Sequence, residues 1–401
     1  MAQANAIDSL PPGFWYEVPD SKIADVDPED DPDANPNWPG IAPWAGVEGQ
    51  PGVINDWSSA AWDESRGWLM LWGGGHSGYA GNEVYAFDIE TLAWTRLTNP
   101  SIDVSVTGTT LYTDGQPRAR ETYNYLEYLP ALDRMVSFGG GNLYPCCNVT
   151  TELAAFNPDT LTWDTTTLAP HTGSQFFMFG ATVSLDPQTG LVWLTQPGNT
   201  KMRSYNPQTN SWTGHVTFDT LQYRNAIIDP VMRYLLITGL HGNLYSYNLD
   251  TPGQPPVLRN TTGATSIQNI QFPGLTWDST EERVLGWSSG GAIHALDTKT
   301  WEWSLIEPDP ANTVVPTAPN GNGTHGRFRY VASKHAVILV NRVTDNVFIF
   351  KLPNGDPGRD SDSDGTPDAQ DNCIAEPNGP TTPDSGGNVQ LDSDGDGIGN
   401  L

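Results

Sequence analysis

The feature that most restricts the fold of this chain is a set of four short strand-like segments that recurs along most of its length. The first copy reads SSAAWD, GWLMLWGGG, NEVYAFD and AWTRL, and five further copies follow in the same order. In five copies an Asp or Asn closes the third segment before a turn, where its side chain can cap the backbone; these residues are Asp88, Asn157, Asn206, Asn248 and Asp297. Their spacings of 69, 49, 42 and 49 residues suit the length of a propeller blade, about 40–50 residues.

The repeat predicts an all-β fold, a β-propeller of four-stranded blades. One such sheet cannot bury both of its faces alone, whereas radial packing of several sheets buries them and leaves only short edges. The sixth copy lacks a fourth segment, but the N-terminal GFWYEVP supplies a spare one, in which Trp15 corresponds to Trp94 and Trp303 of other copies. We therefore expect six blades, with the ring closed by the N-terminal strand. Seven blades remain the alternative if residues 34–57 or 98–117 contain strands.

Glycine runs end the second segment of three copies, with GGG at 73–75, GGG at 139–141 and GG at 290–291. With the aromatic position later in each copy, these runs resemble the repeats of Kelch-type (galactose-oxidase-type) propellers, over roughly residues 12–353. The resemblance implies the fold and leaves the function open, since Kelch-like propellers include oxidases, lyases and binding modules. Galactose oxidase carries a copper site of two Tyr and two His with a Cys–Tyr crosslink. That constellation has no match here, and we expect no organic cofactor.

A different resemblance ends the chain, which we divide into a leader remnant (1–11), the propeller (12–355) and an acidic tail (356–401). Residues 360–373 read DSDSDGTPDAQDNC and resemble a thrombospondin type 3 calcium repeat. A second copy, DSDGDGIGN, begins at residue 392, and we expect the natural tail to continue beyond it. Clustered carboxylates beside a glycine that permits a sharp bend suit Ca²⁺. The predicted ligands are Asp360, Asp362, Asp364, Asp368, Asp371, Asp392, Asp394 and Asp396. The alternative is a solvated acidic linker.

The formal net charge of −28 argues against a nucleic-acid partner, which would require a basic surface. The charge is uneven: residues 1–33 carry nine acids and one Lys, and residues 356–401 carry eleven acids and one Arg. The two ends therefore hold −8 and −10, which leaves −10 for the middle. No run of 18 apolar residues occurs, so no membrane span is expected. Because low-affinity calcium sites fill outside cells, we expect a secreted or cell-surface protein, a monomer whose signal peptide has been removed.

One face of a propeller is built from the loops between the second and third strands and from the loops between blades. Sorting the polar residues by this rule places four of the seven His and several Arg on that face, which suits an anionic ligand. The candidate catalytic residues are His76, His171, Tyr223 and Arg224. The candidate substrate-binding residues are Trp57, Asn82, Arg120, Tyr123, His241, His325 and Arg327. The alternatives are that His76 only braces its glycine-rich loop and that Arg120, Arg224 and Arg327 pair with acids lining the channel. Cys146 and Cys147 form either a vicinal disulfide or two thiols.

These residues favour an enzyme acting on an acidic polysaccharide, uronate or sulfated, by lyase-type β-elimination. An Arg would neutralise the carboxylate, and Tyr or His would act as base and acid. The alternative is a non-catalytic module that binds a cell-surface glycan or a protein and stands on a calcium-stiffened stalk. A hydrolase is less favoured because acids on this face are few: Asp56, Glu83 and Glu121. A metal site of His76, His241 and His325 is a further alternative.

Overall fold

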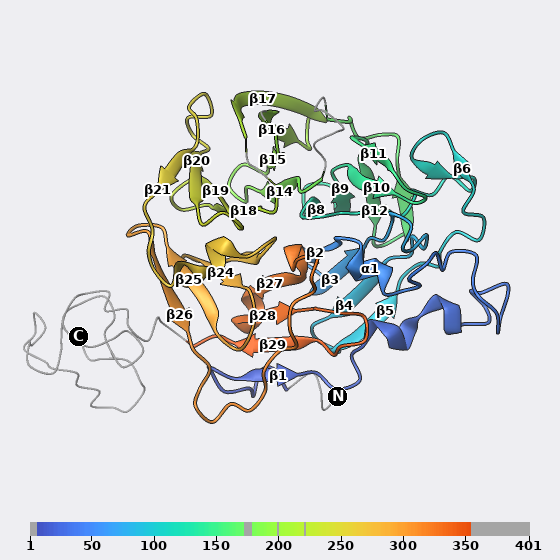
Figure 1. The fold of residues 1–401 in the computed structure, drawn as a ribbon, viewed down its shortest axis with the longest axis horizontal. Coiled ribbons are helices and arrows are strands. Elements are labelled where there is room, and N and C mark those ends of the chain that lie inside the picture. Colours follow the sequence, from blue (N-terminus) through green and yellow to red (C-terminus); the bar gives the residue numbers. More distant parts are fainter. Residues whose placement is uncertain (1–5, 172–178, 199, 220–221, 354–401) are drawn as a thin grey trace, which may run out of the picture.

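The computed structural model describes residues 6–171, 179–198, 200–219 and 222–353. These residues form six four-stranded antiparallel sheets, arranged as propeller blades around a central axis, with the innermost strands nearest the axis (Figure 1). The all-β, six-bladed prediction is confirmed. The predicted calcium ligands between Asp360 and Asp396 lie outside the described residues, so the calcium site stays a prediction.

The blades follow one another around the ring in chain order. From the innermost strand outward, blade 1 consists of β2 (Ser59–Asp63), β3 (Trp68–Trp72), β4 (Tyr85–Asp88) and β5 (Ala93–Arg96). Blade 2 consists of β8 (Leu126–Leu129), β9 (Arg134–Ser137), β12 (Ala154–Asn157) and β13 (Thr162–Asp164). Blade 3 consists of β14 (Thr182–Leu185), β15 (Val192–Thr195), β16 (Thr200–Asn206) and β17 (Ser211–Phe218). Blade 4 consists of β18 (Asn225–Asp229), β19 (Tyr234–Thr238), β20 (Leu244–Asn248) and β21 (Val257–Arg259). Blade 5 consists of β23 (Gly274–Asp278), β24 (Arg283–Trp287), β25 (Ile293–Asp297) and β26 (Glu302–Ile306). Blade 6 consists of β27 (Phe328–Val331), β28 (Ala336–Leu339), β29 (Phe348–Lys351) and β1 (Trp15–Glu17).

The remaining elements lie in the connections. They are the hairpin strands β6 (Val106–Thr107), β7 (Leu111–Tyr112), β10 (Gly140–Leu143) and β11 (Asn148–Thr150), the short β22 (Thr262–Gly263) parallel to β26, α1 (Gly52–Asn55), and the 3₁₀ helices η1 (Ile23–Val26), η2 (Pro28–Asp30), η4 (Thr265–Asn269), η5 (His325–Arg327) and η6 (Ala332–Lys334). The segments 34–57 and 98–117 hold only α1 and the β6–β7 hairpin, so the seven-bladed alternative is wrong. No helix in the described part of the chain is long and apolar enough to cross a membrane.

The ring closes through the N-terminal strand, as predicted. β1 pairs antiparallel with β29, with Trp15 opposite Phe350 and Glu17 opposite Phe348, and Figure 1 shows β1 in blue beside β29 in orange. The Trp15 side chain is buried, its ring centroid lies 5.0 Å from that of Phe350, and its indole Nε1 donates to the Gly291 carbonyl at 2.7 Å. The first and the last described strands therefore complete one blade.

The Asp or Asn that marks each repeat caps the turn after the third strand. The Asp88 carboxylate accepts hydrogen bonds from the backbone N–H groups of Glu90 and Thr91, at 2.7 and 3.0 Å. Asn157, Asn206, Asn248 and Asp297 accept equivalent bonds. The periodic signal in the sequence is thus the local chemistry of a turn between strands.

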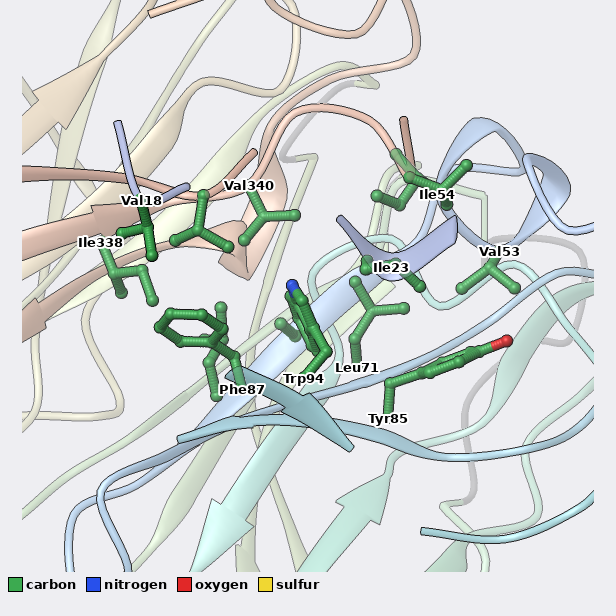
Figure 2. Close-up of a cluster of buried hydrophobic side chains, with 14 of the residues drawn as sticks. Val18, Ile23, Val53, Ile54, Leu71, Tyr85, Phe87, Trp94, Ile338 and Val340 are labelled. Carbon is green, nitrogen blue, oxygen red and sulfur yellow. The ribbon is translucent and has the colours of Figure 1, made fainter. Parts of the chain in front are cut away.

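The arm between β1 and β2, residues 18–58, packs its apolar side chains on blade 1 (Figure 2). Ile23 and Ile54 of the arm contribute to one buried cluster with Leu71 and Trp94 of blade 1 and Val340 of blade 6. The Trp94 indole N–H also donates to the Ser21 carbonyl at 3.0 Å. The arm therefore reinforces the junction between the first and the last blade.

Buried carboxyl groups lie under and beside this arm. The Glu83 carboxylate accepts the Tyr79 and Tyr85 hydroxyl groups at 2.9 and 2.7 Å, and Gln50 of the arm donates to the Tyr85 hydroxyl. Burial raises the pKa of Glu83 to about 7 and that of Asp27 to about 6. Burial, followed by the charges of nearby glutamates, raises the pKa of Asp56 to about 8. These groups keep their protons in the folded chain at a pH where an exposed carboxyl has lost its own.

We expect the free energy of unfolding to fall as the pH rises from about 7 to about 9, because Glu83 and Asp56 keep protons in the folded chain that the unfolded chain has lost. Below about pH 7 the histidines whose pKa is lowered by burial act in the opposite direction. The stabilisation by the carboxyl groups is fully present below about pH 4, the ordinary carboxyl pKa, and is lost as the pH passes through the raised values. Thermal unfolding across this range measures the slope, and Glu83→Gln should flatten it while the exposed Glu302→Gln should not. A stability that rises over the same range would contradict this account.

Candidate functional site

A ring of residues with left-handed backbone surrounds the central axis at one end of the innermost strands. Each innermost strand is preceded, two or three residues before its start, by one residue with positive φ. We call these residues the collar: Trp57 (φ 51°), Tyr123 (41°), Gly180 (79°), Tyr223 (70°), Phe272 (46°) and His325 (51°). Backbone bonds join neighbouring members, since Tyr123 N–H donates to the Trp57 carbonyl at 2.6 Å and Phe272 N–H to the Tyr223 carbonyl at 3.0 Å. The repeat thus places the collar residues at the same end of the six innermost strands.

The rings of the collar meet across the axis. Tyr123 of blade 2 lies with its ring centroid 5.6 Å from that of Phe272, which precedes the opposite blade 5, and 5.9 Å from that of His325. Phe272 also contacts Tyr223 at 5.5 Å. A Cβ on Gly180 would lie only 3.3 Å from the Phe272 ring, so the glycine leaves room for that ring. Aromatic side chains therefore form a continuous layer across the axis, which we call the floor.

Parts of this floor are exposed. The Tyr223 side chain is 37% exposed and Trp57 is half-buried, whereas Tyr123, Phe272 and His325 are buried beneath them. Trp57 stacks on Tyr123 with centroids 6.2 Å apart and an interplanar angle of 26°. Flat aromatic faces with a polar edge are suited to stacking against sugar rings.

A histidine–carboxylate pair lies beside Trp57. His76, from the glycine-rich β3–β4 loop, has its Nδ1 2.7 Å from Oε1 of Glu121. The His76 side chain is 44% exposed, whereas that of Glu121 is fully buried. Asn142 holds the carboxylate from the other side, with its backbone N–H at 3.0 Å from Oε2 and its amide nitrogen at 2.9 Å from Oε1. The Asn142 amide nitrogen also lies 3.1 Å from Nδ1 of His76. In the neutral tautomer that donates its Nδ1 proton to Glu121, Nε2 is free to accept a proton.

Trp57 also stacks on His76, with centroids 6.1 Å apart and an interplanar angle of 28°. The exposed imidazole is thereby held between a buried carboxylate and the edge of the aromatic floor. His76, Trp57, Tyr123, Tyr223 and His325 are the predicted site residues that the structure brings together, through the ring contacts of the floor.

Three of the arginines on this face are buried and hold the backbone of the surrounding loops through hydrogen bonds. Arg118 donates to the carbonyls of Thr109, Tyr144 and Pro145, and Arg120 to those of Thr110, Arg118 and Gly139. Arg327 donates to the carbonyls of Ser58, Gly323, Val340 and Asn341. All three are at most 1% exposed. The sequence suggested ligand contact or pairing with acids for Arg120 and Arg327, but main-chain oxygens take their hydrogen bonds.

The other predicted residues lie elsewhere on the face. Asn82 is buried and holds the long loop between blades 1 and 2 through Ser101 and Pro117, at the edge of a cleft of about 520 Å³ between that loop and Trp163 of blade 2. His171 is buried edge-on against Trp212, and burial lowers its pKa to about 3. His241 is exposed in the β19–β20 loop.

The described residues contain no group of three or more His, Cys, Asp or Glu that could hold a metal ion. His325, one member of the suggested histidine site, is buried with its Nε2 2.9 Å from the Asn322 carbonyl. Cys146 and Cys147 form a vicinal disulfide between β10 and β11, the first of the two alternatives.

Two parts of the site were not among the predicted ligands. Glu121 and Asn142 act on His76 from the next blade, and no local pattern in the sequence reports that pairing. Phe272 had a usable signal, because it precedes the Asp that ends its strand, Asp278, by the same six positions that separate Trp57 from Asp63.

No protein-family model and no curated protein matches this chain.

Proposed function

We propose that the collar face binds an acidic polysaccharide and cleaves it by β-elimination, with His76 as the base. The observation that supports this most directly is the exposed imidazole whose Nδ1 is fixed by the buried Glu121 carboxylate, 2.7 Å away. Such a pair presents Nε2 toward solvent as a proton acceptor, and a positioned base of this kind contributes about 10²–10⁴-fold to a rate.

In the proposed reaction, Nε2 of His76 takes the proton from the carbon next to the uronate carboxylate. The electron pair left behind forms the new carbon–carbon double bond, and the glycosidic oxygen leaves with its bonding pair. That oxygen takes a proton from the Tyr223 hydroxyl or from water. Exposed Tyr223 and Trp57 would hold neighbouring sugar rings by stacking.

The second candidate is a non-catalytic glycan- or protein-binding module. It is favoured by the burial of Arg118, Arg120 and Arg327, which removes three cations from the surface that a uronate would meet. Under either function we keep the proposal that the protein is exported, which the vicinal disulfide supports because disulfides persist in oxidising compartments.

The full chain incubated with a panel of uronate, sulfated and neutral polysaccharides separates the two functions. A lyase gives an unsaturated product that absorbs in the ultraviolet, with no added cofactor. Binding without product on any uronate would refute the lyase and support the binding module. If the chain neither binds nor cleaves any polysaccharide of the panel, both functions are refuted.

Trp57→Ala is expected to weaken polysaccharide binding by roughly tenfold or more, the equivalent of about 1.4 kcal/mol, because it removes the stacking face beside His76. Calorimetric titration of the variant with the best polysaccharide of the panel measures the loss. Trp38→Ala is the matched control, since Trp38 is a tryptophan of the N-terminal arm that is 47% exposed and is not a member of the collar. Equal affinities of the two variants would place the binding surface elsewhere.

A further inference from the structure

Arg224 differs from the other buried arginines of this face. It follows the collar residue Tyr223 and is 1% exposed, as buried as Arg118, Arg120 and Arg327. Those three donate to main-chain carbonyls, whereas Nε, Nη1 and Nη2 of Arg224 have no hydrogen-bond partner among the described residues. The guanidinium carbon lies 5.2 Å from the centroid of the Tyr245 ring. Burying a guanidinium whose donors are unsatisfied costs free energy. The Tyr245 side chain and the charge of Asp219 offset only part of the effect of burial on the pKa of Arg224.

Other unused donors lie at the same junction between blades 3 and 4. In the described residues, 14 buried side-chain atoms lack a hydrogen-bond partner, and six of them belong to Trp193, Thr195, Arg224 and Asn225. Five of these six are the three Arg224 nitrogens, the Trp193 indole N–H and the Thr195 hydroxyl, which can all donate. Five unused donors and one unused acceptor, Oδ1 of Asn225, therefore lie at this junction.

The strand geometry places these groups together. Trp193 and Thr195 are two residues apart on β15 and so share one face of blade 3. Trp193 packs in the apolar cluster between blades 3 and 4, and Tyr245, the ring beside Arg224, packs on the same cluster. Thr195 ends β15 and Arg224 directly precedes β18, so both lie at the collar end of the two blades.

We propose that this junction is an oxyanion site, in which Arg224 and Thr195 hold a carboxylate or sulfate group. A planar guanidinium matches the two oxygens of a carboxylate or sulfate in a bidentate fork, and the charge-assisted bonds offset the cost of burial. The anion is either a free ion or the acidic group of the polysaccharide, and only the second source rests on the proposed function. The site would then select uronate or sulfated substrates.

The test compares thermal unfolding of the full chain in sodium sulfate, in sodium glucuronate and in sodium chloride of equal ionic strength. We expect sulfate or glucuronate to raise the midpoint by about 2 °C or more over chloride. Arg224→Gln should abolish that difference, and Arg224→Lys should retain part of it, because lysine keeps the charge but loses the fork. The comparison between variants removes the general salting effect of sulfate.

Without any added anion, Arg224→Gln should unfold at the wild-type midpoint or above it, because it removes an unpaired buried charge. Arg120→Gln should unfold at a lower midpoint, since it leaves carbonyls unbonded. An Arg224→Gln variant that is destabilised as much as Arg120→Gln, or that keeps the anion response, would overturn the proposal.

Competition between sulfate and the polysaccharide separates the two sources of the anion. If the site holds a free ion, added sulfate leaves polysaccharide binding unchanged. If the site holds the acidic group of the substrate, sulfate competes with the polysaccharide, and Arg224→Gln weakens uronate binding more than neutral-glycan binding. The oxyanion site can thus be confirmed even where the lyase proposal fails.

Discussion

His76→Ala is expected to lower the rate of polysaccharide cleavage by about 100-fold or more, because it removes the proposed base. The imidazole is exposed, so the substitution should leave the unfolding midpoint close to that of the wild type. Initial rates of unsaturated product formation, measured with the most active uronate of the panel, give the effect. A variant that keeps more than about a tenth of the wild-type rate would exclude His76 as the base.

Glu121 is a positioning residue, and its role has a different signature. Glu121→Gln keeps a side chain of the same shape but removes the carboxylate that lies against Nδ1 of His76. We expect kcat to fall while KM changes little, because the imidazole is no longer held in the orientation that presents Nε2 to the substrate. A purely structural glutamate would show its loss in the unfolding midpoint and would not change kcat alone. Lys299→Ala, in the β25–β26 turn on the opposite face, is the matched control.

Trp15→Ala is expected to lower the free energy of unfolding by about 3–5 kcal/mol, the usual cost of truncating a large buried aromatic residue. The indole is 2% exposed and is the main apolar anchor of β1. Its loss removes the Phe350 contact and the hydrogen bond to Gly291. Because β1 completes blade 6, the substitution destabilises the strand pairing that closes the ring.

Denaturant unfolding of Trp15→Ala, compared with the exposed Trp38→Ala, measures this effect. A loss below about 1 kcal/mol would mean that the ring stays closed without the N-terminal strand. Cooperative unfolding in a single transition is expected for the wild type, since adjacent blades share buried clusters around the ring.

The fold was predictable because its signals are local and repeated. The alternation of strand residues and the Asp or Asn after the third strand depend on neighbouring residues, and the sequence repeats them in several copies. The spare N-terminal strand stands once, and the incomplete sixth copy supplied its partner. The sequence placed the arginines of the collar face in the correct loops but did not identify their hydrogen-bond partners. Arg120 and Arg327 bond to main-chain oxygens, and no side-chain pattern in the sequence encodes such acceptors.

The site itself was predictable only in part. His76 and Trp57 were found from their loops, but the carboxylate that fixes His76 lies 45 positions away in the connection to the next blade. Pairing of that kind depends on the angle between blades, which the sequence does not express. The left-handed collar repeats with the blades, so a stricter alignment of the copies would have reached Phe272.

The way the ring closes also decides how the molecule bears mechanical load. The segment after residue 353 continues from β29, a strand hydrogen-bonded on one side to β1 and on the other to β28. A force applied between the collar and residue 353 acts along β29, so the bonds on both of its sides resist together in shear. The seam of the ring therefore does not open one hydrogen bond at a time under such a load.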